Sequence, residues 1–155
     1  MLRPVDAQDA RFLRDLLRHA YHWRLNADPD LPVYRYVQNW GRRGDAGVVA
    51  FDGPNAYGAA WYRLFTAAEP GFGFVDVETP ELTIAVVPSH RGAGVGAELL
   101  EALLEQARAD GFPAVSLSAE VGQTGFYERL GFEPVGEGAN AVTMVARLSL
   151  ASAPR

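Results

Sequence analysis

The stretch that decides the fold is residues 82–104, which read LTIAVVPSHRGAGVGAELLEALL. Its first six residues are apolar or β-branched, as in a buried strand, and Pro88 ends the run. Glycines follow at every second position, and apolar residues then recur at helical spacing, with charged residues between them. The stretch therefore predicts a strand, a glycine-rich turn and a helix that begins near Val95.

The glycine-rich turn has the features of a phosphate-binding loop. Glycine lets the backbone approach a ligand closely and direct its N–H groups outward. The N-terminus of the following helix adds a partial positive charge, and Arg91 adds a cation that can contact a phosphate. Taken alone, however, the same pattern fits a glycine turn with a purely structural role.

Two other nucleotide-binding motifs compete for the same glycines. A P-loop needs a lysine after its last glycine, and the chain contains none. The dinucleotide fingerprint is met by Gly92, Gly94 and Ala97, and Glu120 ends the next expected strand, as a ribose-binding acid would. Too few residues follow Glu120 to complete a doubly wound sheet, so an NAD(P)-dependent oxidoreductase is the disfavoured alternative.

The rest of the chain predicts an α+β protein. Asp6, with Asp9 three residues later, predicts a capped helix start, and residues 52–55 predict the turn of a hairpin. The expected strands are 2–5, 46–51, 56–65, 81–87, 114–119, 132–135 and 141–148, with a further extended stretch at 72–77. The expected helices are one that follows Asp6, 33–40, 95–110 and 124–130.

Composition excludes several classes of function. The 155 residues contain no cysteine, and the three histidines lack the spacing of metal ligands, so no metal is expected. The net charge of −5 argues against a nucleic-acid partner. The chain has no long apolar run and no apolar signal core, so we expect no membrane partner and a cytoplasmic location. Its length predicts a single domain over residues 1–149, followed by a short tail at 150–155.

Two motifs, in the right order and at the right spacing, resemble the GNAT superfamily of N-acetyltransferases. The family's [QR]-x-x-G-x-[GA] signature is matched by Arg91, Gly94 and Gly96, and its aromatic run by FYERLGF at residues 126–132. The resemblance is sharpest over residues 81–136. It implies a GNAT fold, with a central, mostly antiparallel, splayed mixed sheet of about 6–7 strands flanked by about four helices.

The resemblance also implies an activity and a co-substrate. The enzyme would move an acetyl or other short acyl group from acetyl-CoA to a primary amine of a small molecule or peptide, by direct attack in a ternary complex. A non-catalytic module that binds or senses acyl-CoA is the alternative, and a homodimer is left open. The pantetheine arm would lie along one strand, with a bulge near Ala85 and Val86, and the pyrophosphate would lie on the loop. These contacts fall on Ala85, Val86, Val87, Arg91, Gly92, Ala93, Gly94, Val95 and Gly96.

The family pattern implies two catalytic residues. Tyr127 matches the tyrosine that contacts CoA and protonates the leaving thiolate, a role that suits a phenol with a reference pKa near 10. Glu81 lies where some members carry a general base that acts through water, and Glu78 is the nearest rival. Each residue also has a non-catalytic interpretation. Tyr127 could be an aromatic ring that only packs near CoA, and Glu81 could be a solvated charge at a strand end.

Two further stretches bear on the site. Many family members carry an asparagine in the loop that corresponds to residues 120–125. This chain has no asparagine in that loop, so Gln123 or backbone groups would take over its contacts. An aromatic-rich stretch occurs where relatives build the acceptor pocket, although its rings fit a hydrophobic core equally well. Its members are Tyr21, His22, Trp23, Tyr34, Tyr36 and Trp40.

Overall fold

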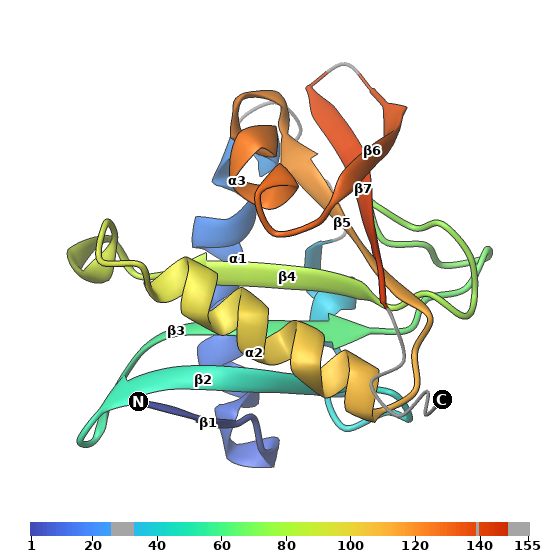
Figure 1. Cartoon of the computed structure of the whole chain (residues 1–155). Helices are drawn as coiled ribbons and strands as arrows, with labels where there is room; N and C mark the ends of the chain where they lie inside the picture. Colours follow the sequence, from blue (N-terminus) through green and yellow to red (C-terminus); the bar gives the residue numbers. More distant parts are fainter. Residues whose placement is uncertain (26–32, 139, 149–155) are drawn as a thin grey trace, which may run out of the picture. The chain divides into compact units, whose positions relative to one another are not determined.

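The computed structural model describes residues 1–25, 33–138 and 140–148 (Figure 1). These residues form two compact units. Unit 1 comprises Met1–Tyr62 and Thr83–Leu103, and unit 2 comprises Arg63–Leu82 and Leu104–Arg155. The predicted tail at 150–155 lies outside the described residues, as do the side chains of His22 and Trp23.

Unit 1 is built on an antiparallel set of strands in the order β1-β2-β3-β4. The hairpin of β2 and β3 closes at Gly53, whose φ is 58°, and places Asp52 opposite Asn55. In Figure 1, the helices α1 and α2 lie on opposite faces of these strands. The bounds are β1 (Leu2–Pro4), β2 (Ala46–Asp52), β3 (Asn55–Arg63), β4 (Glu81–Val86), α1 (Ala10–Leu25), α2 (Val95–Ala109) and the 3-10 helices η1 (Ala7–Asp9), η2 (Val33–Tyr36) and η3 (Pro88–His90).

The predicted cap at the start of the first helix is confirmed. The Asp6 side chain accepts a hydrogen bond from the backbone N–H of Gln8, and Asp9 accepts one from the N–H of Asp6. Asp9 also accepts two hydrogen bonds of 2.8 Å from Arg3 on β1, which lower the pKa of its carboxyl. The cap lies at the start of the 3-10 helix η1, and α1 follows directly after it.

The core of unit 1 settles the role of two predicted acceptor-pocket residues. Tyr21 and Tyr36 are 3% and 1% exposed, and their ring centroids are 5.1 Å apart. The Tyr21 hydroxyl lies 3.1 Å from Oγ1 of Thr83, and Trp61 donates from Nε1 to the Tyr36 carbonyl at 2.9 Å. Both tyrosines are therefore core residues whose polar groups are satisfied.

Unit 2 continues from β4 in the order β4-β5-β7-β6. β5 pairs in parallel with β4 at Glu81 and Ser116, and antiparallel with β7 along its whole length. The end of α2 is closed by Gly111, with φ of 85°, and by a hydrogen bond from Phe112 N–H to the Ala107 carbonyl. The bounds are β5 (Ala114–Glu120), β6 (Glu133–Glu137), β7 (Ala141–Arg147), α3 (Thr124–Glu128) and the 3-10 helix η4 (Val121–Gln123).

The prediction of a mixed α+β sheet of about 6–7 strands is confirmed, because the sheet has seven strands. The described residues contain three α-helices rather than about four. The expected helix at 33–40 is only the single turn η2, since Asn39 and Gly41 adopt positive φ angles of 56° and 107° that end it. The extended stretch expected at 72–77 is not a strand but a looped segment.

The loop at 72–77 lies against a strand of its own unit. A Cβ atom added to Gly73 would lie 2.6 Å from the carbonyl carbon of Leu117 and 2.8 Å from the backbone nitrogen of Ser118, both on β5. A hydrogen bond from Phe74 N–H to the Gly71 carbonyl turns the chain at the same place. Glycine is therefore required at 73 because it alone allows the loop backbone to touch the strand.

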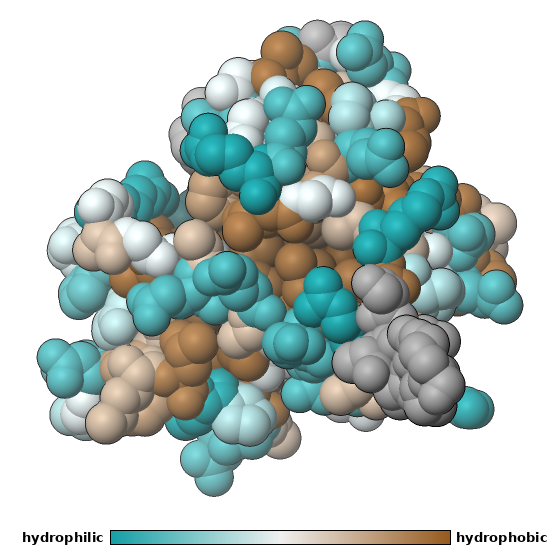
Figure 2. Space-filling view, viewed as in Figure 1, coloured by the Kyte–Doolittle hydropathy of each residue, from teal (hydrophilic) through white to brown (hydrophobic). Residues whose placement is uncertain are grey.

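Apolar residues are not confined to the core. Exposed examples include Val75, Val121 and Val135, and hydrophobic residues reach the surface among polar ones on the face in Figure 2. No helix among the described residues is long and apolar enough to cross a membrane.

We predict that Gly73→Ala lowers the free energy of unfolding by about 1–3 kcal/mol, because the new methyl group meets backbone that cannot rotate away. Urea unfolding followed by circular dichroism measures this change. Gly122→Ala is the matched control, since a Cβ there meets nothing within 4 Å, and it should stay within about 0.5 kcal/mol of the wild type. Equal stability of both variants would contradict the contact.

Candidate functional site

The glycine loop connects β4 to α2 and is anchored at its start. The Val87 N–H donates to the Tyr57 carbonyl on β3 at 2.9 Å, which fixes the end of β4. Arg91 then folds back, and its Nε donates to the Val86 carbonyl at 3.0 Å. The arginine therefore holds the loop to the strand, and its two terminal guanidinium nitrogens form no hydrogen bond with any described residue.

The loop itself is shaped to receive an anion. Gly92 and Gly94 have φ angles of 84° and 81°, and a Cβ at either position would meet nothing within 4 Å. Within the described chain, the backbone N–H groups from Gly92 to Ala97 donate to no other residue, and the first helical bond is that from Glu98 to Gly94. Free amides at a helix N-terminus are a favourable place for a phosphate. The predicted residues 91–96 thus fit a CoA pyrophosphate.

A pair of stacked rings, which sequence reasoning missed, braces this loop. His90 was expected to be a surface residue, and it is exposed. Its ring nevertheless stacks on Tyr57 of β3, with centroids 4.2 Å apart and planes 10° from parallel, and Ser89 Oγ lies 2.9 Å from His90 Nδ1. No pattern in the sequence relates these two residues, which lie 33 positions apart, so only the pairing of β3 with β4 reveals the contact.

The strand residues predicted to hold the pantetheine arm lie directly before the loop. Ala85 is buried, whereas Val86 and Val87 are partly exposed. Gly58 on β3 faces them, and a Cβ there would lie 3.2 Å from the Ala85 carbonyl oxygen. The bulge expected at Ala85 and Val86 stays a prediction.

Glu81 is a buried acid and not a solvated strand-end charge. Glu81 is only 1% exposed, whereas Glu78, the other candidate for the general base, is exposed. Opposite it in the β4–β5 pair is Ser116, which is fully buried and whose Oγ has no hydrogen-bond partner among the described residues. A buried hydroxyl of this kind is a usual site for an ordered water.

Tyr127 lies in α3, in an aromatic environment. Its ring meets Phe126 and Phe132 edge-on, with centroid distances of 5.1 and 5.9 Å. Burial of the phenol raises the pKa of Tyr127 to about 12, because the phenolate would lose its hydration. The side chain is therefore a neutral hydrogen-bond donor at neutral pH.

The loop that lacks the family asparagine forms η4, and Gln123 at its end is exposed. The loop glycines and β4 residues 85–87 belong to unit 1, whereas Glu81, Tyr127 and Gln123 belong to unit 2. Among the described residues, no group of three or more histidine or acidic side chains could hold a metal ion.

The sequence model of the acetyltransferase (GNAT) family matches residues 10–132 of this chain. The chain belongs to the GNAT family. It is 40% identical over 62 residues to the L-methionine sulfoximine/L-methionine sulfone acetyltransferase of Pseudomonas aeruginosa. That alignment covers 38% of this chain and only 36% of the Pseudomonas protein.

Solved structures show the same GNAT fold over almost the whole chain. The ribosomal-protein-alanine N-acetyltransferase of Brucella melitensis has a TM-score of 0.68 and 23% identity, over 96% of this chain and 99% of that one. A phosphinothricin acetyltransferase of Sinorhizobium meliloti, in complex with acetyl-CoA, has a TM-score of 0.67 and 23% identity, over 100% and 91% of the two chains. The predicted GNAT fold is thereby confirmed.

Proposed function

We propose that this protein is an N-acetyltransferase that transfers an acetyl group from acetyl-CoA to a primary amine. The observation that carries the proposal is the row of free amides from Gly92 to Ala97 at the start of α2, in a chain of the GNAT family. We assign the pyrophosphate to these amides and the pantetheine arm to residues 85–87. We assign the domain to residues 1–149 and its location to the cytoplasm.

In the proposed reaction, the neutral amine attacks the thioester carbon, and the C–N bond forms as the C–S bond breaks. Glu81 accepts the proton that the amine loses, through a water that binds to the buried Ser116 hydroxyl, which has no hydrogen-bond partner among the described residues. Tyr127 donates a proton to the departing sulfur, a role supported by its neutral phenol. The products are an amide and free CoA, and the proton held by Glu81 returns to Tyr127, which restores the carboxylate and the neutral phenol.

The acceptor is a small-molecule amine or a peptide amine. The Pseudomonas relative is named for two methionine derivatives, both of which carry an α-amino group. A panel of amino-acid-like amines, polyamines and peptides with free N-termini, followed by thiol release, is therefore the screen that we propose.

We predict that the protein binds acetyl-CoA and that Gly94→Trp weakens binding at least about tenfold, because the indole covers the free amides. Calorimetric titration with acetyl-CoA, and with NADH in parallel, measures this. Gly53→Trp is the matched control, since Gly53 also has a positive φ and open space but lies in the β2–β3 turn. Binding of NADH in place of acetyl-CoA would overturn the assignment.

We predict that Tyr127→Phe lowers kcat about a hundredfold, while the Kd for acetyl-CoA changes by less than about threefold. The reason is that phenylalanine keeps the aromatic packing but removes the proton donor. Steady-state kinetics with an amine from the screen measures the effect. An unchanged kcat would show that Tyr127 only packs against its neighbours, and a wild type that binds acetyl-CoA but acetylates nothing would favour the sensing module.

We predict that Glu81→Gln lowers kcat at least about tenfold across pH 6–9, because the amide cannot accept the proton of the amine. Glu78→Gln is the matched control, since Glu78 is an exposed acid three residues away, and it should retain the wild-type rate. Full activity of Glu81→Gln over this pH range would leave Glu81 with only a structural role.

A further inference from the structure

Positive charge is concentrated in one part of this acidic chain. Residues 11–43 contain seven of the 14 arginines and only three acidic residues, whereas the remaining residues contain seven arginines and 16 acidic residues. The segment is thus positive by four in a protein whose net charge is −5. Like charges that gather in this way repel each other, and an anionic ligand bound among them would relieve that repulsion.

A hollow of about 600 Å³ opens within this basic segment, in unit 1. One wall is α1, which contributes Ala10, Arg11 and Arg14, and the other wall is the segment after η2, residues 37–40. This volume is in the range of sites that hold small organic ligands. None of the lining residues belongs to the loop that we assign to CoA.

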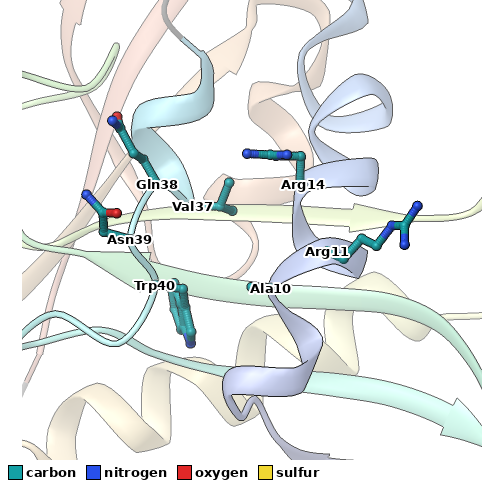
Figure 3. A pocket seen from close by; sticks show the side chains of 7 residues that line it. All are labelled: Ala10, Arg11, Arg14, Val37, Gln38, Asn39 and Trp40. Atoms are coloured by element: carbon teal, nitrogen blue, oxygen red, sulfur yellow. The ribbon is translucent and has the colours of Figure 1, made fainter.

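Arg14 is the side chain suited to bind an anion here. Figure 3 shows its guanidinium reaching from α1 toward residues 37–40, whereas that of Arg11 points away. The guanidinium carbon lies over the Tyr34 ring, 5.4 Å from its centroid, in a cation–π contact. It makes no hydrogen bond or ion pair with any residue that the structure describes. Its N–H groups therefore remain available for a carboxylate.

Among the described residues, the acids close to Arg14 along the chain form no ion pair with it. Asp15 is exposed on the next position of α1 and forms no ion pair within the described parts of the chain. Asp45 accepts hydrogen bonds from the backbone N–H groups of Gly41 and Arg42 at 2.9 and 2.8 Å. A further arginine of α1, Arg18, lies one turn beyond Arg14 and is not among the residues that line the hollow.

The other lining residues indicate what the uncharged part of the ligand would be. Val37 and Ala10 are apolar, and the indole of Trp40 adds an aromatic surface, while Gln38 and Asn39 carry neutral amides. A cation that points toward apolar and aromatic walls matches a ligand with one charged end and an apolar body.

We propose that this hollow is a second ligand site, which binds a small organic carboxylate whose carboxylate pairs with Arg14 and whose apolar body lies against Val37 and Trp40. None of its lining residues belongs to the acetyl-CoA loop or to the residues that we assign to the transfer reaction.

The test is a titration of the full-length protein with 3-phenylpropionate, followed by NMR of the tryptophan indole N–H resonances, with Trp40 identified by Trp40→Phe. We expect a saturable shift of the Trp40 signal and a Kd that rises about tenfold or more in Arg14→Gln. Arg18→Gln, an exposed arginine of the same helix outside the hollow, should change the Kd by less than about twofold.

Two further titrants make each outcome decisive. Neutral 3-phenylpropionamide should bind at least about tenfold more weakly than the acid, and equal binding would overturn the role of charge. Inorganic phosphate should not saturate the site, and phosphate binding with the same dependence on Arg14 would replace the organic carboxylate by a simple anion. No saturable shift with phenylpropionate also overturns the proposal, provided that the Arg14→Gln and wild-type proteins have the same unfolding transition.

Discussion

The structure depends on a sharp change of direction between β4 and α2. The chain must leave a buried strand and start a helix within eight residues, and it does so because Gly92 and Gly94 adopt angles that other residues avoid. Arg91 ties this turn to Val86, and the stacked rings of Tyr57 and His90 tie it to β3. The helix then buries Leu99, Leu100 and Leu103 completely. The turn that exposes the backbone amides thus also positions α2 so that its leucine side chains are buried.

Patterns with a local cause could be read from the sequence. The cap at Asp6 and Asp9, the hairpin at residues 52–55, the helix at 95–109 and the Gly111 stop each follow from side chains within one or two turns. The match of two motifs to a known family also predicted the fold, and the comparisons confirm it. These are cases in which local preference and tertiary structure agree.

Features that depend on contacts between distant residues could not be read in this way. The extended composition of residues 72–77 suggested a strand, but Gly73 brings that segment against the backbone of β5 instead. The sequence did not distinguish core from surface residues in the aromatic stretch, where Tyr36 is 1% exposed and Tyr34 is 58% exposed. The burial of Glu81 follows from its pairing with Ser116, which is 35 residues away. In each case the partner lies too far along the chain for periodicity to indicate it.

The aromatic surroundings of Tyr127 constrain how a proton can move in the proposed reaction. A phenol with a pKa of about 12 is a far weaker acid than a thiol, whose reference pKa is about 8.5. Full transfer of the proton to sulfur would leave a phenolate at a cost of roughly 5 kcal/mol. In the proposed reaction, Tyr127 would therefore work best as a relay, which passes its own proton to the sulfur while it receives the proton that Glu81 took from the amine. In such a relay no anion would reside on the ring, so the packing of Phe126 and Phe132 against that ring would not slow the exchange.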